Sequence, residues 1–346
     1  MKKFFQIFIL ISTATLLFLA ILFWWVFYAS NTKIPYNNTQ SIFIPTDTNF
    51  DSLQSIINPY LKSDLTFKWA AKVKMYHAYP RAGHYVLERG MGNQQLINTL
   101  RSKNQEIKVV FNNQETLSAF AGRVAQQIEA DSAELLNAFS DKDFLNRQQL
   151  STDQVLSLFI PNTYSMYWNT DADSFAERMA KESTRFWNVE REMLREKLKM
   201  SREEVITLAS IVHQESKKPD ERPRVAGVYL NRLKRGMKLQ ADPTVVYAMK
   251  KKANDFDLEI RRVLYKDLKI KSPYNTYRNK GLPPGPICMP DIDAIDAVLK
   301  PERHNYLYFV ADPYNPGYHL FGKTLSQHAA NKRIYTRWLN RNEIMR

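Results

Sequence analysis

The pattern of hydrophobic positions sets the first thirty residues apart from the rest of the chain. Residues 4–28 contain no charge, and a helix of this length spans about 37 Å, enough to cross a bilayer core of about 30 Å with some tilt. Lys2 and Lys3 precede the run, and its far end is aromatic, as expected when the N-terminus stays in the cytoplasm. A cleaved signal peptide is the alternative, but the run is longer than an h-region and no A-x-A-like site follows it. The pattern therefore predicts an uncleaved single-pass anchor over residues 1–30, with the rest of the chain outside the cytoplasm.

Beyond the anchor, short runs with strand-like and helix-like periods predict a small mixed module. Residues 31–40 are polar and have no period, so we expect a tether there, and residues 68–79 have a mixed pattern that predicts no element. Alternating apolar positions predict strands, and apolar residues three and four positions apart predict helices. The expected elements are a strand at 41–45, a helix at 50–61, a strand between turns at 82–91 and a helix at 92–100. Together they predict a small α+β module over residues 41–105.

The remainder of the chain, residues 106–346, has the pattern of a larger α+β unit. Its expected elements are a strand at 107–111, helices within 117–147, a short strand at 159–164 broken by Pro161, and a long charged helix or pair of helices at 170–198. Alternating charge signs along that last segment are typical of a solvated helix face. The fold class predicted for the whole chain is therefore α+β, preceded by the transmembrane helix.

Composition then limits the partners of the exported part. The chain has 49 basic and 35 acidic residues and a net charge of +14, which predicts attraction to an anionic partner. Outside the cytoplasm we expect no nucleic acid, and an anionic envelope polymer or a lipid surface takes its place. The single cysteine, Cys288, excludes an intramolecular disulfide, and there is no second thiol to build a structural zinc site.

The clearest candidate for chemistry is Glu215. Ser201 and Glu204 form a capping-box pattern that starts a helix, and at 100° per residue Glu215 falls among the apolar positions of that helix. A carboxyl group placed there has a raised pKa and can act as a general acid. The alternative is that Glu215 lies past the buried part of the helix and pairs with one of the lysines that follow it.

No other catalytic pattern competes with this glutamate. His213 flanks the apolar face and is expected to be structural, since no histidine or acid stands four residues away to complete a metal pair. The chain has no Walker loop, no G-x-G-x-x-G before a suitable helix and no Ser-His-Asp order, so nucleotide-binding and serine-hydrolase functions have no support. Segments rich in Tyr, Asn, Pro and Gly lie downstream, and they suit either sugar binding or simple turns.

Five ordered blocks in this region resemble the MltG (YceG-like) endolytic murein transglycosylases, and the resemblance spans nearly the whole exported chain. The blocks are Leu208-Ala-Ser-Ile-Val-His-Gln-Glu-Ser216, Val228-Tyr-Leu-Asn-Arg-Leu233, Leu239-Gln-Ala-Asp-Pro-Thr-Val245, Tyr274-Asn-Thr-Tyr277 and Gly281-Leu-Pro-Pro-Gly-Pro-Ile287. The resemblance implies an inner-membrane enzyme with a LysM-like first module (41–105) and a periplasmic catalytic domain (106–346). Such an enzyme cuts nascent peptidoglycan strands internally, next to the cell-wall synthases, and needs no cofactor or metal.

The resemblance also implies roles for single residues. Glu215 is the catalytic residue that it implies, and the residues implied to hold the glycan are Ser216, Asn231, Gln240, Asp242, Thr244, Tyr274, Asn275 and Tyr277. Two departures stand out. The family's Leu-Glu-Gly-Tyr-Leu-Phe-Pro loop is Val155-Leu-Ser-Leu-Phe-Ile-Pro161 here, for which we expect only general cleft lining, and an often acidic position is His213.

Three other functions stay open at this point. A hydrolase would use Asp242 as a second carboxylate. A catalytically silent glycan-binding scaffold would not depend on Glu215, and a basic nucleic-acid binder would require the chain to lie inside the cytoplasm.

Overall fold

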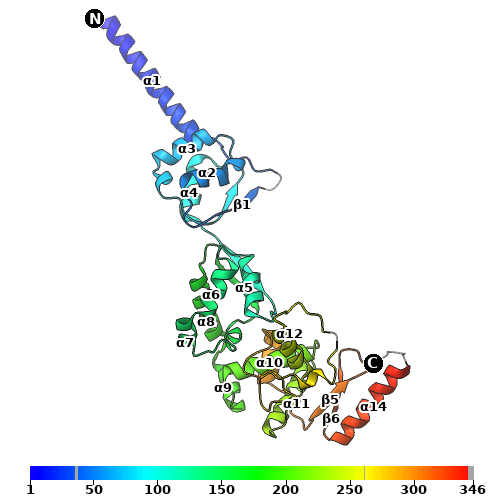
Figure 1. Cartoon of the computed structure of the whole chain (residues 1–346). Helices are drawn as coiled ribbons and strands as arrows, with labels where there is room; N and C mark the ends of the chain where they lie inside the picture. Colours follow the sequence, from blue (N-terminus) through cyan, green and yellow to red (C-terminus); the bar gives the residue numbers. More distant parts are fainter. Residues whose placement is uncertain (36–37, 261, 342–346) are drawn as a thin grey trace. The chain divides into compact units, whose positions relative to one another are not determined.

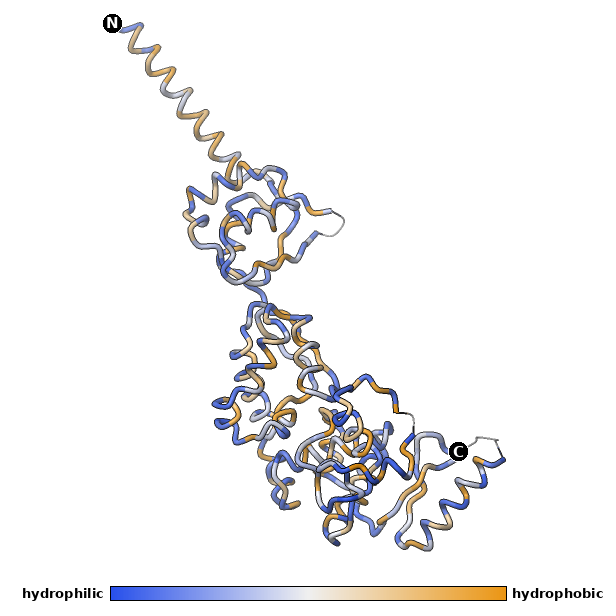
Figure 2. Tube along the Cα trace, in the orientation of Figure 1, coloured by the Kyte–Doolittle hydropathy of each residue, from blue (hydrophilic) through white to orange (hydrophobic). Residues whose placement is uncertain are grey.

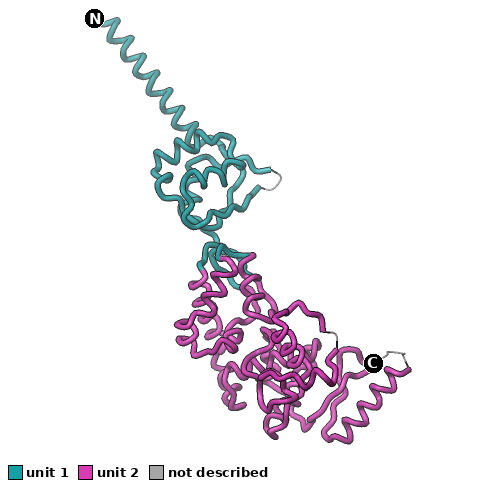
Figure 3. The backbone as a smooth tube through the Cα atoms, in the orientation of Figure 1, with its two compact units in different colours: residues 1–109, 127–130, 164–171 teal, residues 110–126, 131–163, 172–346 magenta. Residues whose placement is uncertain are grey.

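The structure is a computed structural model, and it describes residues 1–35, 38–260 and 262–341. The chain forms two compact units (Figure 3): unit 1 comprises residues 1–109, 127–130 and 164–171, and unit 2 the rest. Both contain helices and short strands, which is consistent with the predicted α+β class. Residues 36–37 of the expected tether, and 261 and 342–346 of the expected catalytic region, lie outside the described residues.

The N-terminal helix α1 (Lys2–Tyr28) has the length and composition of a membrane span. Its mean hydropathy is 2.5 over the most apolar window, none of which is buried in the protein, and Figure 2 shows hydrophobic positions along its whole length. A long helix whose most apolar window is left uncovered by the protein is consistent with a single-pass membrane anchor.

The segment after α1 packs into unit 1, so the expectation of a free tether at its start is wrong. Asn31 and Thr32 are 4% and 1% exposed, and their backbone amides donate to the Met91 carbonyl at 2.8 and 3.1 Å. The anchor's own Phe27 is 4% exposed and belongs to the core of unit 1. The polar composition of this segment suggested exposure to water. Its buried polar side chains instead form hydrogen bonds with buried backbone groups.

Helix α4 (Asn93–Ser102) joins α1 to unit 1 through close backbone contacts. The Asn93 side chain donates to the carbonyl of Val26 at 2.7 Å. A Cβ atom on Gly92 would lie 2.9 and 2.8 Å from the carbonyl oxygens of Phe27 and Tyr28, so only glycine allows the two helices to approach this closely.

Unit 1 is a two-stranded antiparallel sheet with helices packed around it (Figure 1). Strand β1 (Thr39–Ile44) pairs with β2 (Gly83–Glu88), in register from Thr39 opposite Glu88 to Ile44 opposite Gly83. Helices α2 (Phe50–Ile57), α3 (Asp64–Val73) and α4 supply the other core residues. The strands, α2 and α4 overlap the predicted elements, although α2 ends at Ile57 and not at residue 61. Helix α3 was not predicted, because large apolar residues occupy its outer face and hide the amphipathic period.

Two short segments from later in the chain complete unit 1. Glu129 accepts hydrogen bonds from the amide and the hydroxyl of Thr46 at 2.5 and 2.7 Å, and the ring of Trp168 packs 5.1 Å from that of Phe43. Strand β3 (Glu106–Phe111) pairs with β4 (Asn162–Tyr167). The predicted strand at 159–164 thus starts later than expected, since Pro161 cannot donate to a strand ladder.

The first part of unit 2 is a group of helices around stacked phenylalanine rings. Phe120 lies 4.5 to 6.2 Å from the rings of Phe139, Phe159 and Phe175, measured between ring centroids. Aromatic pairs at such separations stabilise a core beyond the area they bury. The elements that carry or adjoin these rings are α5 (Leu117–Ala125), α6 (Ser132–Ser140), α7 (Lys142–Gln148), the 3-10 turn η3 (Val155–Leu158), α8 (Ala172–Phe186) and α9 (Val189–Leu198).

Helix α10 (Arg202–Glu215) is the centre of the second part of unit 2. The predicted capping box is present: Glu204 N donates to Ser201 Oγ at 3.1 Å, and Ser201 N donates to Glu204 Oε2 at 2.8 Å. All eight residues from Val205 to Val212 are buried, so the helix is covered on every side and does not have the single apolar face that we expected. The elements around it are α11 (Arg222–Lys234), α12 (Asp242–Ala253) and α13 (Ile292–Leu299), followed by β5 (Tyr308–Ala311), β6 (His319–Gly322) and α14 (Leu325–Arg341).

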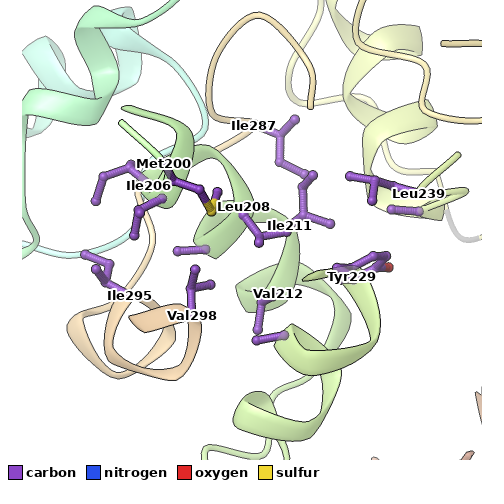
Figure 4. Packing of buried hydrophobic residues seen from close by; sticks show 14 of the residues in the cluster. Met200, Ile206, Leu208, Ile211, Val212, Tyr229, Leu239, Ile287, Ile295 and Val298 are labelled. Carbon is purple, nitrogen blue, oxygen red and sulfur yellow. The ribbon is translucent and has the colours of Figure 1, made fainter. Parts of the chain in front are cut away.

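The close-up of this core shows what fixes the C-terminal end of α10 (Figure 4). Ile211 lies toward Ile287, and Tyr229 of α11 lies near Val212. Ser210 ties α10 to the Pro-Gly segment, because its hydroxyl accepts the amide of Ile287 at 3.0 Å and donates to Thr207 O at 2.7 Å. The helix end is therefore held on several sides, as positioning a catalytic side chain requires.

Candidate active site

Glu215 is the last residue of α10 and carries a direct hydrogen bond from Tyr229 of α11. The Tyr229 hydroxyl lies 2.6 Å from Glu215 Oε1, and Tyr229 itself is 1% exposed. The sequence alternative, an ion pair between Glu215 and the lysines that follow, is not what the structure shows. Glu215 points into the protein toward a tyrosine, at the edge of a cleft.

Burial raises the pKa of Glu215 to about 7, and the neighbouring Asp242 charge adds to the rise. The hydrogen bond from Tyr229 and the nearby His319 and Arg232 act in the opposite direction. Burial also raises the pKa of Tyr229 well above 10, so this hydroxyl keeps its proton and acts as the donor. The result is a carboxyl group that is partly protonated at neutral pH, the property a general acid needs.

The turn after Glu215 is fixed by buried polar contacts centred on Glu221. Its Oε2 accepts from Ser216 Oγ at 3.1 Å and lies 2.8 Å from His319 Nδ1, and its Oε1 accepts from His319 N at 2.7 Å. Arg222 Nε donates to Ser216 O at 3.0 Å. Ser216, predicted to contact substrate, is 1% exposed and belongs to this scaffold behind the catalytic candidate.

Glu215 lines a cleft of about 1230 Å³ in unit 2, larger than the roughly 300–1,000 Å³ of a pocket for a drug-sized ligand. The lining combines carboxylates, tyrosines and cations, a set that offers flat faces and hydrogen bonds to a polyhydroxylated polymer. The polar members of this lining are Glu115, Gln214, Glu215, Asp242, Tyr247, Lys250, Arg262, Tyr265, Tyr277, His328, Lys332 and Tyr335.

Asp242 and Tyr277, which the resemblance implied to hold the glycan, line this cleft together with Glu215. Asp242 is the first residue of α12, and Tyr277 donates to its Oδ1 at 2.5 Å. Gln240 is exposed and has a φ of 50°, so its backbone takes a left-handed conformation just before α12. The backbone amide of Gln240 donates to Thr276 O at 3.2 Å.

The other predicted binding residues use their polar atoms to hold the frame of the cleft. Asn231 Nδ2 donates to His304 O and Tyr306 O at 2.9 and 3.1 Å, and Asn275 Nδ2 donates to Leu268 O and Ile270 O at 3.0 and 2.9 Å. Thr244 Oγ1 donates to Ala241 O at 2.7 Å. Tyr274 is 1% exposed and reaches Asp153 Oδ1 at 3.0 Å. Their contacts make them supports for the cleft.

The two departures from the family pattern also lie away from the cleft. His213 Nδ1 faces Asp291, 3.4 Å from both its amide and its Oδ2, and burial lowers the pKa of this histidine. The segment 155–161 is almost wholly buried, with Phe159 at 1% exposure in the aromatic core. None of its residues is among those that line the described cleft, so the expectation of cleft lining is wrong for this loop.

Tyr229, Arg232 and His319 are the site residues that sequence reasoning missed. Arg232 is 7% exposed and donates to Leu307 O at 2.6 Å, so it brings a buried positive charge near Glu215. One signal was available for Tyr229: a tyrosine amid the apolar residues of a helix has a hydroxyl that must find a partner. Among the described residues, no group of three His, Cys, Asp or Glu side chains could hold a metal ion.

Comparisons with known proteins agree with the motif blocks. The model of the YceG-like family matches residues 42–334. The protein named endolytic murein transglycosylase from Bacillus subtilis is 30% identical over 316 residues, which cover 86% of this chain and 85% of that protein. A protein of the same name from Streptococcus pneumoniae R6 is 27% identical over 302 residues, and the match spans 54% of its length.

A solved structure extends the comparison to the fold. The crystal structure of a yceG-like protein from Listeria monocytogenes superposes with a TM-score of 0.57 at 27% identity, covering 85% of this chain and 98% of that one. The similarity therefore includes three-dimensional arrangement as well as sequence.

Proposed function

This chain belongs to the YceG-like family, and from that premise we propose that it is an endolytic murein transglycosylase, an enzyme of the lyase class acting on peptidoglycan. In detail, we propose that it cleaves the MurNAc–GlcNAc bond of nascent glycan strands, leaves 1,6-anhydroMurNAc ends and so terminates or trims strand elongation. The observation that carries the proposal is the Glu215 carboxyl group, with a pKa near 7, hydrogen-bonded by Tyr229 at the edge of a large polar cleft.

In the proposed mechanism Glu215 acts first as acid and then as base. Tyr229 occupies Oε1 as a donor, which assigns the acidic proton to Oε2. That proton passes to the glycosidic oxygen as its bond to C1 of MurNAc breaks. The resulting carboxylate then removes the proton of the C6 hydroxyl of the same sugar, whose oxygen closes on C1. One carboxylate suffices because the attacking group is part of the substrate.

Supporting residues divide between substrate contact and positioning. We propose that Asp242, Tyr277 and Gln240 contact the glycan, since the first two line the cleft and the third is exposed beside them. The remaining candidates, Ser216, Asn231, Thr244, Tyr274 and Asn275, hold the walls of the cleft through the hydrogen bonds described above.

A two-carboxylate hydrolase is the second candidate, because Asp242 lines the same cleft as Glu215 and raises its pKa. The two reactions leave different ends. A transglycosylase forms an anhydro ring, whereas a hydrolase adds one water and leaves a reducing end.

Mass spectrometry of glycan fragments from purified sacculi separates these possibilities. We expect anhydro ends from the wild type, almost none from Glu215→Gln and a partial yield from Asp242→Asn. Glu196→Gln is the matched control, since this carboxylate is 69% exposed on α9. Wild-type yield from Glu215→Gln would refute the mechanism. No cleavage product from any of the proteins, wild type included, would favour a silent scaffold, and reducing ends lost equally in both site variants would establish the hydrolase.

We also propose the cellular setting implied by the family. Helix α1 would anchor the chain in the inner membrane with the N-terminus cytoplasmic, unit 1 would serve as a LysM-like module, and unit 2 would act in the periplasm beside peptidoglycan synthases. A reporter enzyme that works only outside the cytoplasm, fused after Arg346, should be active. Activity only from a reporter that works in the cytoplasm would contradict this topology.

A further inference from the structure

Helix α3 carries a row of large apolar side chains on its outer face. Leu65, Trp69 and Val73 follow one another at intervals of four residues and are 63%, 65% and 61% exposed. Residues four apart lie on the same face of a helix, so the three form one continuous row. On the inner face Phe67 and Ala70 are fully buried in the core of unit 1. The side chains of the row therefore take no part in the core of unit 1 and are free to contact a partner.

The row begins where α1 ends. Asn31, three residues beyond α1, clamps Ser63, which is the N-cap of α3: Asn31 Oδ1 accepts from Ser63 N and Asn31 Nδ2 donates to Ser63 O, both at 2.8 Å. Helices α1 and α3 also contact one another directly, and Figure 1 shows α3 at the end of unit 1 from which α1 leaves. Whatever surrounds the end of α1 therefore also meets α3.

Positive charge gathers at the same place. Lys68 and Lys72 are exposed between the apolar residues of the row, while Asp64 is the acidic residue in the first turn of α3. A neighbouring cavity of about 470 Å³ is lined by Ser30, the residue two positions after α1, together with Lys33, Lys62 and Arg89. Lys62 Nζ donates to Ser30 Oγ at 2.8 Å, which places this charge beside the exit of α1.

We propose that α3 lies in the headgroup layer of the bilayer crossed by α1, with Leu65, Trp69 and Val73 at the acyl boundary and the surrounding lysines and Arg89 on anionic lipid phosphates. The inference rests on the membrane anchor of the proposed function. A short helix with a tryptophan-containing apolar face and flanking lysines has the composition of an interfacial helix. Lys and Arg side chains near an anionic lipid surface are attracted to it. Continuity with α1 selects a bilayer as the occupant over a protein partner.

Spin labels in the full chain, reconstituted in vesicles of phosphatidylethanolamine and phosphatidylglycerol, test the inference. Labels are introduced with Leu65→Cys and Val73→Cys, which leave Trp69 in place. Native Cys288 is fully buried and its thiol pKa is raised to about 11, so it reacts slowly. Leu16→Cys within α1 marks the bilayer interior. Lys103→Cys marks water, because it follows α4, whose first turn contacts α1 and whose end lies about 15 Å further along the helix.

Collision of each label with oxygen, which concentrates in lipid, and with a water-soluble nickel complex gives its depth. We expect the labels at 65 and 73 to be exposed to oxygen and shielded from nickel at least several-fold more than the label at 103. Trp69→Glu should move the label at 73 toward water, and vesicles of phosphatidylcholine alone should do so in part.

Labels at 65 and 73 that match the one at 103, while Leu16 stays in lipid, would overturn the inference and leave the anchor intact. A Leu16 label in water would instead remove the anchor, and the inference with it.

Discussion

At the scale of single residues, the chemistry of Glu215 is set by what surrounds its carboxyl group. Burial and Asp242 favour the protonated form, while Tyr229, His319 and Arg232 favour the charged form. The balance leaves the pKa near the pH at which the acid must work. A fully exposed glutamate would be ionised at that pH.

The first prediction concerns pH. In the proposed mechanism the protonated form of Glu215 is the active acid, so strand cleavage should decline as pH rises through about 7, roughly tenfold for each unit above the pKa. Cleavage rates measured from pH 5 to 9 on soluble glycan, beside a thermal melt at each pH, check this. A flat profile over a range where the protein stays folded would contradict the assignment.

The second prediction separates Tyr229 from a purely structural residue. Tyr229→Phe removes a hydrogen bond that stabilises the carboxylate, so the pKa of Glu215 should rise and the alkaline limb of the profile should move to higher pH. Hydrogen bonds to charged groups contribute about 1.5–3 kcal/mol, so the shift should approach one unit or more. Tyr318→Phe is the control, since that hydroxyl bonds Asp220 at 3.0 Å and does not line the described cleft. An unmoved limb would leave Tyr229 only a packing role.

Sequence reasoning could single out Glu215 as a candidate acid but could not find the residues that shift its pKa. The capping box and the helical period place this carboxyl among apolar residues from local information alone. Tyr229, 14 positions along the chain, and His319, more than a hundred, reach the site only through the packing of α11 and β6. The same limit applies to polar residues such as Asn275, which the resemblance implied to hold the glycan. The neighbouring sequence does not reveal that the side-chain amide of Asn275 already donates to two backbone carbonyls.

At the scale of elements, α10 shows how a helix can present one functional residue at its end. Its cap fixes the start, and burial of every residue from Val205 to Val212 fixes the rest. The periodicity predicted a helix but not its complete burial, because polar residues of the helix, Ser210 among them, find their partners in distant loops. Helix α3 shows the reverse case, in which an exposed apolar face disguised an amphipathic helix.

The third prediction tests the cap. Ser201→Ala removes the acceptor for the Glu204 amide, which should lower the free energy of unfolding by about 1 kcal/mol. Thermal or denaturant unfolding of unit 2 measures this, and activity below the transition should stay at the wild-type level. Ser201→Asp retains an N-cap acceptor and should keep most of the stability. Equal loss in both variants would argue that the cap hydrogen bond is not the cause.

At the scale of the whole molecule, the chain divides into two units whose borders the sequence only approximates. The expected boundary near residue 105 ignores residues 127–130 and 164–171, which belong to unit 1. No periodic pattern reveals this, because residues of these segments contact unit 1 through single side chains. Glu129 accepts two hydrogen bonds from Thr46, and the ring of Trp168 packs on that of Phe43. Deleting residues 41–100 alone would therefore leave Trp168 without its partner.

The fourth prediction concerns where a soluble version of the protein should begin. A chain starting at Val26 keeps Phe27, whereas one starting at Asn31 loses this core residue and the helix end that receives the Asn93 amide. Burying a phenylalanine contributes about 1.5–3 kcal/mol, so the shorter chain should show faster amide hydrogen exchange in β1, β2 and α4. Exchange in α10 serves as the internal control and should not change. Identical exchange in unit 1 of both chains would contradict the role of Phe27.

The joint between α1 and unit 1 has a further consequence for how the module moves. A flexible linker would let it tumble, but the Gly92 contact and the Asn93 hydrogen bond make the helix and the module one body. If α1 lies in a bilayer, as proposed, the motions left to that body are mainly lateral diffusion and rotation about the helix axis. Under the proposed function the protein would then meet its glycan by a search over a surface and not through a volume, so encounter rates would depend on the number of copies per membrane area.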